Sequence, residues 1–492
     1  MTIDLRLDLR LKNYVNGRFV ESRATQYKDV INPATLEKVT EVSFSTKEDV
    51  KEAVESSYEA FKSWSEIPIT ERIKYLFRMR ESIIVHQDEI ARFIVQEHGK
   101  TLSEAKGEIR RALDNIEASV AAVYHIMGKN NVDISKGLDE ELINEPLGVF
   151  ASIIPFNFPV MIPFWFLPYA IATGNTIIIK PSPRTPMSFT LVMKIFHKEV
   201  KLPPGVVNLV HGDKEAVDAL LEHKLIRGVT FVGTTQIAKY VYEKGAAFGK
   251  RVIAQASAKN FVLVMPDANL QMSIPNIVES FYGNAGQRCL AAANLVVLKE
   301  NYRKVLNWFI EEAKNYVLGY GLDEGVTMGP MNSKEGKARV LSYLSKGLEE
   351  GAKLVLDGRT FKVKGSYPED NFIGPSVFDN VSPSMEIAQE EIFGPVASVI
   401  EVSSFEEAID VINSSRYGNA ASIFTSSGKY ARLFKKYVKA GNIGINVGVA
   451  QPIAWYPFAG MKESHFGDLH GQGGQDYIYF FTDRKVVISR WW

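Results

Sequence analysis

One cysteine is the first candidate for chemistry. Cys289 is the only cysteine among 492 residues, so it cannot form an intrachain disulfide or a multi-thiolate metal site. A free cysteine is often an inert buried side chain, but Arg288 adjoins this one. A neighbouring cation or a helix N-terminus lowers a thiol pKa and makes the thiol reactive. No histidine lies close in sequence, so a reactive thiol here points to acyl or hemithioacetal chemistry on a carbonyl.

A second candidate is Asn157, in the segment Pro155-Phe-Asn-Phe-Pro159. Two prolines restrict the backbone on either side, so the amide is held with little freedom. A positioned amide N–H can stabilise an oxyanion, typically by about 3 kcal/mol. An ordinary turn asparagine is the alternative that these residues leave open.

Two loops could bind a nucleotide. Lys180-Pro-Ser-Pro-Arg184 directly follows the β-branched run 176–180, and loops at the carboxyl ends of parallel strands bind ligands. Lys180 and Arg184 could meet ribose hydroxyls or phosphate, or they could be solvated cations. In 231–238, a predicted strand ends at Gly233 and turns into a helix whose N-terminus could bind phosphate. The chain has no G-x-G-x-x-G here, so this signal alone is weak.

The elements that must position these residues alternate between helix and strand. Ser45 and Glu48 predict a capping box before a helix that ends at Trp64, and a second helix starts at Thr101 and can extend to Gly128. Further predicted elements are helices at 187–200, 214–223 and 235–244, and strands at 206–210, 229–232 and 261–265. This alternation predicts a doubly wound parallel sheet, with a second α/β stretch over 266–452. The aromatic, strand-like tail 477–492 has no partner nearby in sequence, so another subunit is its candidate partner.

Composition limits the classes of partner. The chain has 57 basic and 57 acidic side chains, which provide no electrostatic reason to expect nucleic acid or an acidic membrane surface. The segment 147–179 carries no charge and exceeds the ~20 residues that span a bilayer. Four prolines interrupt it, so we interpret it as buried core. Met1–Arg10 lacks the apolar core of a signal peptide, and we expect a soluble, cytoplasmic protein.

Together these segments resemble the aldehyde dehydrogenase superfamily. The motifs that occur in the order of that family are 155–159, Lys180-Pro-Ser182, Phe231-Val-Gly-Thr234, Gly286-Gln-Arg-Cys289 and Glu391-Ile-Phe-Gly-Pro395. The resemblance extends from Tyr14-Val-Asn-Gly17 to the C-terminal strand, and it is strongest to the CoA-acylating methylmalonate-semialdehyde dehydrogenases. The sharper markers of that branch are Met161-Ile-Pro-Phe-Trp165, Ala258-Lys-Asn260 and Met265-Pro-Asp-Ala-Asn269.

The resemblance implies an architecture. It places a Rossmann-like, parallel-sheet NAD(P)-binding domain in residues 1–129 and 147–256, and an α/β catalytic domain in 257–455. A small β oligomerisation arm with the C-terminal strand takes up 130–146 and 456–492. The expected assembly is a homotetramer, a dimer of dimers, with no metal.

The resemblance also implies roles. Cys289 attacks an aldehyde to form a thiohemiacetal, its own backbone N–H and the Asn157 side chain hold the oxyanion, and hydride transfer to the nicotinamide leaves a thioacyl enzyme. The implied cofactor-binding residues are Ile154, Phe156, Lys180, Arg184, Gly233, Thr234, Glu391 and Phe393. Arg111 and Arg288 are implied to bind a substrate carboxylate, although Arg111 could equally be a surface helix residue.

Position 255 separates the branches of this family. Hydrolytic members resemble one another in carrying a glutamate that activates water there, whereas Gln255 cannot accept a proton. A CoA thiol is then the expected acyl acceptor. The expected function is NAD(P)-dependent oxidation of malonate or methylmalonate semialdehyde to an acyl-CoA. The alternatives are a hydrolytic aldehyde dehydrogenase and a non-catalytic nucleotide-binding or structural protein.

Several positions depart from the family pattern. Pro183 stands where the family has a glutamate that binds the adenosine ribose, so NADP use is open. Ser257 replaces a glycine, and Gln255 replaces the asparagine usual in this branch. The stretch 447–455 also differs near the substrate mouth, which leaves the identity of the aldehyde open.

Overall fold

Two large sheets organise the molecule, which we describe from a computed structural model over residues 7–492. Most of the N-terminal segment expected to lack a signal peptide, Met1–Arg10, therefore lies outside the described residues. Within them, no helix is both long and apolar enough to cross a membrane. The charge-free segment 147–179 is almost entirely buried, as the prolines within it predicted.

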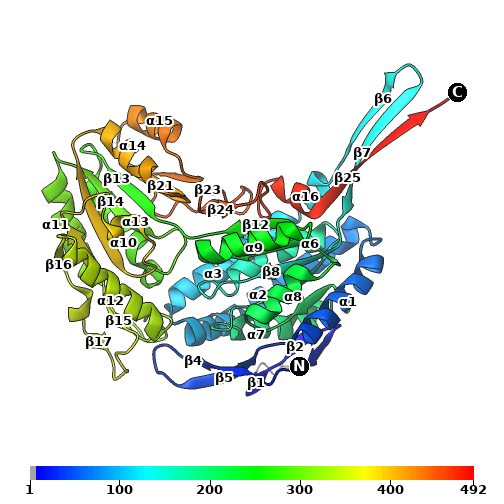
Figure 1. The fold of residues 1–492 in the computed structure, drawn as a ribbon, viewed down its shortest axis with the longest axis horizontal. Coiled ribbons are helices and arrows are strands. Elements are labelled where there is room, and N and C mark those ends of the chain that lie inside the picture. The colour runs from blue at the N-terminus through cyan, green and yellow to red at the C-terminus, as the bar shows by residue number, and fades with distance from the viewer. Residues whose placement is uncertain (1–6) are drawn as a thin grey trace.

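The first sheet has eight strands in the order β24-β12-β11-β8-β9-β10-β2-β3, and its central strands β12, β11, β8, β9 and β10 are parallel. Their bounds are β2 Asn13–Val15, β3 Arg18–Val20, β8 Val149–Ile153, β9 Thr176–Lys180, β10 Val207–Leu209, β11 Ile226–Val232, β12 Arg251–Gln255 and β24 His465–Phe466. Helices lie on both faces (Figure 1): α1 Lys47–Trp64, α2 Ile69–His98, α3 Leu102–Ser119, α4 Ala122–His125, α5 Met161–Phe164, α6 Leu167–Ala172, α7 Met187–Ile195, α8 Lys214–Glu222 and α9 Thr235–Ala247. The doubly wound parallel sheet is confirmed.

The second sheet has seven strands in the order β16-β18-β19-β14-β13-β21-β22. Its strands are β13 Asn260–Val264, β14 Ala292–Leu298, β16 Lys353–Leu356, β18 Ser376–Asp379, β19 Val396–Val402, β21 Ala420–Phe424 and β22 Asn442–Ile445. The accompanying helices are α10 Leu270–Tyr282, α11 Tyr302–Ala313, α12 Lys334–Glu349, α13 Glu386–Gln389, α14 Phe405–Ser414 and α15 Gly428–Tyr437. Because β13 belongs to this sheet, the predicted strand 261–265 begins the second unit rather than ending the first.

Smaller sheets complete the chain. A three-stranded sheet near the N-terminus holds β1 Arg10–Leu11, β4 Tyr27–Ile31 and β5 Lys38–Ser43. Two short pairs are β15 Leu318–Gly319 with β17 Val363–Lys364, and β20 Tyr417–Gly418 with β23 Met461–Lys462.

The C-terminal strand has its partner within the chain, which corrects the expectation of another subunit. β25 (Thr482–Arg490) follows the short helix α16 (Asp476–Phe481) and pairs antiparallel with β7 (Leu138–Pro146) along its whole length. β7 also pairs with β6 (Lys129–Ser135), so the three strands form a ribbon that projects from the body (Figure 1). Local sequence patterns did not indicate this pairing because β7 and β25 lie far apart along the chain.

Two predicted helix boundaries were displaced. The capping box before α1 uses Thr46 and Asp49, one residue later than predicted, while the box at Thr101 and Glu104 is confirmed. The helix that starts after Thr101 ends at Ser119 instead of reaching Gly128. The 30-residue helix α2 was not predicted, and it packs against α3 and α7.

The parallel register explains why the candidate residues meet. β8, β9, β11 and β12 run in the same direction, so their carboxyl ends lie at one edge of the sheet. The segments that leave this edge begin with Ile154, Pro181, Gly233 and Ala256. In open α/β sheets this edge is where ligands bind.

Candidate active site

Cys289 is carried by a tightly turned loop between α10 and β14. Asn284, Ala285 and Gly286 have consecutive left-handed φ angles of 57°, 51° and 72°. A Cβ on Gly286 would lie 2.3 Å from the Gly394 carbonyl oxygen, so only glycine allows these two backbones to approach. Two of the sequence motifs therefore contact each other directly, and the backbone is strained immediately before the cysteine.

A small pocket surrounds the thiol. The residues that line it are Val232, Gln255, Ala256, Cys289, Asn419, Phe458, Ala459, Gly460, Ser464 and His465. The Cys289 carbonyl accepts hydrogen bonds from Asn260 Nδ2 and Asn419 Nδ2, both at 2.8 Å. These two side chains come from the second sheet and its loops, whereas Gln255 ends a strand of the first. The pocket thus lies between the two sheets.

The electrostatics of Cys289 differ from the expectation of a lowered thiol pKa. Burial, reinforced by the negative charge of Glu391, raises the pKa of Cys289 to about 12. Backbone N–H groups of Cys289 and Leu290 and the charge of Arg288 act in the opposite direction but do not prevail. Arg288 is a weak influence because Glu279 and Glu104 pair with its guanidinium, and Cys289 follows a turn rather than starting a helix.

The raised pKa predicts the alkylation behaviour of the ligand-free protein. Because only the thiolate reacts, the rate with iodoacetamide should rise about tenfold per pH unit between pH 7 and 10. Free cysteine, with its pKa of about 8.5, should level off over the same range. Cys289 is the only cysteine, so the intact mass measures its modification without interference. A plateau near pH 8.5 for the protein would contradict this prediction.

Asn157 is held beside the cysteine turn by a buried ion pair. Its Nδ2 donates to the Gln287 carbonyl at 3.0 Å, and its own carbonyl accepts from Lys100 Nζ at 2.8 Å. Lys100 in turn contacts Glu108 at 2.6 Å, with both side chains fully buried. The Asn157 side chain is therefore hydrogen-bonded to the cysteine loop at Gln287, two residues before Cys289, a position that suits an oxyanion donor.

Lys180 and Arg184 lie at the carboxyl end of β9. Lys180 Nζ donates to the carbonyls of Pro181 and Gly212 at 2.8 and 2.9 Å, and burial lowers its pKa to about 8. It is thus a positioned group rather than a solvated cation. The Arg184 guanidinium lies 5.3 Å from the centre of the Phe156 ring. The neighbouring Ile154 donates its backbone N–H to the Lys180 carbonyl at 3.0 Å, which holds the two loops together.

Gly233 and Thr234 lead into α9. The Gly233 N–H donates to the Gln255 carbonyl at 3.0 Å, and Thr234 is the N-cap residue. The Thr234 side chain does not cap this helix, and the Thr235 N–H donates to the Ser257 hydroxyl at 3.2 Å, so only the later N–H groups of the first turn remain available. Such a helix start fits the pyrophosphate of a dinucleotide.

Glu391 and Phe393 approach from the second sheet. Glu391 Oε1 accepts the Ala258 N–H at 3.0 Å, and burial raises the pKa of its carboxyl group. Phe393, with a left-handed φ of 59°, meets the Phe156 ring edge-on at 5.9 Å. The buried Lys259 Nζ, whose charge interacts with Glu391, has no hydrogen-bond partner among residues 7–492. The unpaired Lys259 Nζ and the remaining N–H groups at the start of α9 are donors that fit a dinucleotide between the two units.

The two arginines expected at the substrate do not line this pocket. Arg288 pairs with Glu279 and Glu104 at 2.9 and 3.3 Å. Arg111 is partly exposed on α3, 3.6 Å from Asp114. Neither is among the described residues that line the pocket at Cys289. Their roles remain predictions.

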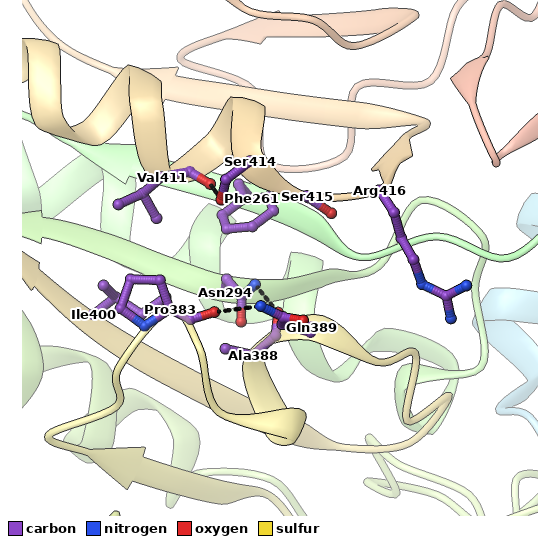
Figure 2. Close-up of a pocket in the computed structure, with 10 residues that line it drawn as sticks. All are labelled: Phe261, Asn294, Pro383, Ala388, Gln389, Ile400, Val411, Ser414, Ser415 and Arg416. Atoms are coloured by element: carbon purple, nitrogen blue, oxygen red, sulfur yellow. Dashed lines mark hydrogen bonds between the residues drawn. The ribbon is translucent and has the colours of Figure 1, made fainter.

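A larger cavity lies elsewhere in the second unit (Figure 2). It has a volume of about 100 Å³ and is lined by Phe261, Asn294, Pro383, Ala388, Gln389, Ile400, Val411, Ser414, Ser415 and Arg416. The Asn294 amide donates to the Ala388 carbonyl at 2.8 Å, and Arg416 pairs with Glu390 and Glu463. Its lining carries no thiol, because the only cysteine lies in the other pocket. We therefore assign the chemistry to the smaller pocket.

His465 and Asn419 are two further residues at this site that the sequence motifs did not predict. Both line the Cys289 pocket, but each stands outside the motifs that drew attention to the other residues. His465 reaches the pocket because β24 pairs antiparallel with β12. Only a prediction of that pairing could have identified it.

Comparison with known proteins gives a consistent result. The model of the aldehyde dehydrogenase family matches residues 19–487. Malonate-semialdehyde dehydrogenase 1 of Geobacillus kaustophilus is 43% identical over 480 residues, covering 98% of this chain and 97% of that protein. Malonate-semialdehyde dehydrogenase 2 of Bacillus cereus is 43% identical over 482 residues, covering 98% of each.

Solved structures show the same similarity. A methylmalonate-semialdehyde dehydrogenase of Oceanimonas doudoroffii superposes with a TM-score of 0.95 at 37% identity, covering 98% of each chain. One of Sinorhizobium meliloti, solved in complex with NAD, superposes with a TM-score of 0.96 at 37% identity, covering 99% of this chain and 98% of that one.

Proposed function

The chain belongs to the aldehyde dehydrogenase family, and from this premise we propose that it oxidises malonate or methylmalonate semialdehyde with NAD(P) and transfers the acyl group to CoA. The observation that carries the acyl transfer is Gln255. This buried side chain lines the pocket with Cys289, and an amide cannot take a proton from water. Relatives named for these semialdehydes support the substrate class.

Cys289 is the nucleophile in this proposal. Its Sγ attacks the aldehyde carbon and forms a thiohemiacetal. At neutral pH the ligand-free thiol is protonated, since its pKa is about 12. The backbone N–H groups of Cys289 and Leu290 favour the thiolate once the proton has left. The departing proton must therefore find an acceptor when substrate occupies the pocket.

The Asn157 amide and the Cys289 backbone N–H hold the oxygen that becomes negative. In the ligand-free site Asn157 Nδ2 donates to the Gln287 carbonyl, so the amide is directed to the cysteine loop before substrate arrives. Preorganised donors of this kind stabilise the transition state more than the ground state.

The cofactor would lie across the carboxyl edge of the first sheet. When bound, the oxidised nicotinamide supplies the hydride acceptor and a positive charge near the thiol. We assign Lys180 and Arg184 to its adenosine side, Gly233 and Thr234 to the pyrophosphate, and Glu391 and Phe393 to the nicotinamide ribose, with the backbone around Ile154 and Phe156 along the cofactor. Pro183 presents no carboxylate to a 2′-phosphate, so both coenzymes are candidates.

Two finer features belong to the same proposal. Arg288 and Arg111 would bind the substrate carboxylate. For this, the Arg288 guanidinium must break its ion pair with Glu279 and pair with the substrate carboxylate instead. The projecting ribbon β6-β7-β25 would join subunits into a homotetramer, since its outer strands leave edges unpaired within the described chain.

The test of this function is the dependence of turnover on CoA. With malonate semialdehyde and NAD(P) but no CoA, we expect a rapid burst in which each active site forms one NADH or NADPH. With CoA present, we expect steady formation of NADH or NADPH. The product should be an acyl-CoA, identified by mass. Steady turnover that ignores CoA would favour the hydrolytic alternative. No burst at all, with any coenzyme, would favour the non-catalytic one.

Introducing the missing carboxylate gives a second prediction. Gln255→Glu should speed release of the acyl group to water, because a general base contributes typically 10²- to 10⁴-fold. The measurement is the steady rate of NADH formation without CoA. Gln255→Asp, whose shorter side chain places its carboxylate farther from the thioester, is the matched control. An unchanged CoA-independent rate in Gln255→Glu would argue against this role of position 255.

A further inference from the structure

A histidine faces the position of the missing carboxylate. β24 pairs antiparallel with β12, and His465 lies directly opposite Gln255 in that register. Residues opposite each other in an antiparallel pair project from the same face of the sheet. Accordingly, both side chains line the pocket that contains Cys289.

The polar atoms of this pair lack hydrogen bonds of normal geometry, although the backbone at Gly467 and Leu469 lies close enough to the His465 ring to act on its pKa. Both ring nitrogens of His465 and both amide atoms of Gln255 are buried without a hydrogen-bond partner of normal geometry anywhere in 7–492. Buried polar groups in native proteins are nearly always paired, so each exception needs an explanation such as a catalytic role or a bound ligand. Four such atoms around one thiol mark a place prepared for a polar ligand.

The imidazole is held in place and kept neutral. Its ring stacks on His470 at 5.2 Å, and His470 Nδ1 lies 3.1 Å from Asp476 Oδ2. Burial, followed by the charge of His470, lowers the pKa of His465 to about 4, while the backbone near Leu469 and Gly467 and the charge of Asp468 oppose this shift. At neutral pH His465 can therefore accept a proton.

We propose that His465 is the general base that takes the proton of the acyl-acceptor thiol during release of the acyl group from Cys289, with the Gln255 amide orienting that thiol. This inference rests on the proposed function, since it assigns a residue to the transfer to CoA.

The step balances within the pocket. The acceptor S–H bond breaks, and its proton passes to a ring nitrogen of His465. The acceptor sulfur bonds to the acyl carbon, and the bond from that carbon to Cys289 Sγ breaks. The cysteine leaves as a thiolate and takes the proton from the imidazolium, which restores the starting state. Because the pKa of Cys289 is about 12, this last transfer is downhill.

A weak base such as His465 removes a proton from a thiol more easily than from water. The imidazole has a pKa of about 4, and a thiol releases its proton near 8.5 whereas water does so near 15.7. The proton transfer is thus far less unfavourable from a thiol. His465 in this position would select the thiol as acceptor without a carboxylate at position 255.

The experiment separates the two halves of the reaction. In the full-length enzyme, His465→Phe keeps a ring of similar size, and His465→Ala leaves space for added imidazole. We expect both variants to retain the NADH burst, to lose CoA-dependent steady turnover by about 10²- to 10⁴-fold, and to accumulate acylated Cys289 by intact mass. Imidazole should restore turnover in the alanine variant but not in the phenylalanine variant. His86→Phe, at a partly buried histidine that pairs with Glu199 outside the Cys289 pocket, is the matched control.

Two results would overturn the assignment. If burst and steady turnover fell together, His465 would act in the attack of Cys289 on the aldehyde. If neither changed, His465 would have no role in the reaction. His465→Asn retains polar atoms but cannot act as a base. The same loss of CoA-dependent turnover in this variant would show that the missing base, and not a folding defect, is the cause. CoA-independent turnover by the unmodified enzyme would instead reject the proposed function, so the two failures remain distinct.

Discussion

Replacing Cys289 with alanine is expected to reduce aldehyde-dependent NADH formation by roughly 10⁴-fold or more, because no other group can form the covalent intermediate. Cys289 is the only cysteine in the chain, so no second thiol can substitute for it. The loss should be equal in the burst and in steady turnover. Stopped-flow absorbance of NADH at saturating aldehyde, with and without CoA, measures both phases.

Binding and folding provide the controls for this variant. Alanine removes one atom beyond Cβ from a partly buried site, so the melting temperature should change little. NAD affinity should stay within a few-fold, since Sγ is not assigned to cofactor binding. Cys289→Ser, which keeps a hydroxyl, should fail as completely, because an unactivated hydroxyl is a poor nucleophile. Substantial turnover by Cys289→Ala would reject the covalent mechanism.

Asn157→Ala is expected to lower the rate of the burst by about 10²- to 10³-fold, the cost of removing one oxyanion donor, or about 3 kcal/mol. The side chain donates to the Gln287 carbonyl and lies beside the cysteine turn, so its loss removes a donor without leaving a buried charge. The KM for the aldehyde should change much less than kcat, because the donor acts on charge that develops in the transition state.

A matched variant distinguishes this role from loop structure. Asn284→Ala removes a second amide that donates to the same Gln287 carbonyl at 3.0 Å, so it tests what that hydrogen bond contributes to the loop alone. We expect it to alter stability more than the chemical step. Equal losses of burst rate in Asn157→Ala and Asn284→Ala would indicate that the Asn157 amide only supports the turn.

The motif residues could be identified from sequence because local chemistry determines them. Lys180 ends a β-branched run, Gly233 ends another, and the segment around Asn157 is bracketed by prolines. Periodicity predicted the parallel sheet, and parallel strands place all their carboxyl ends at one edge. Local pattern and sheet geometry thus suffice to bring these loops together.

Long-range packing determines features of the structure that local sequence patterns do not predict. The tail strand β25 pairs with β7, which lies far away in the sequence. The thiol pKa was expected to fall because of Arg288, yet burial raises it, and burial depends on which other segments cover the cysteine.

The sequence by itself determined the reaction class, because its motifs in order resemble the aldehyde dehydrogenase family, which implies roles for Cys289, Asn157 and position 255. Only the tertiary structure placed His465 opposite Gln255 and beside Cys289. The physical reason is that side-chain spacing along a strand is local, whereas the pairing of β24 with β12 is stabilised by contacts between distant parts of the chain.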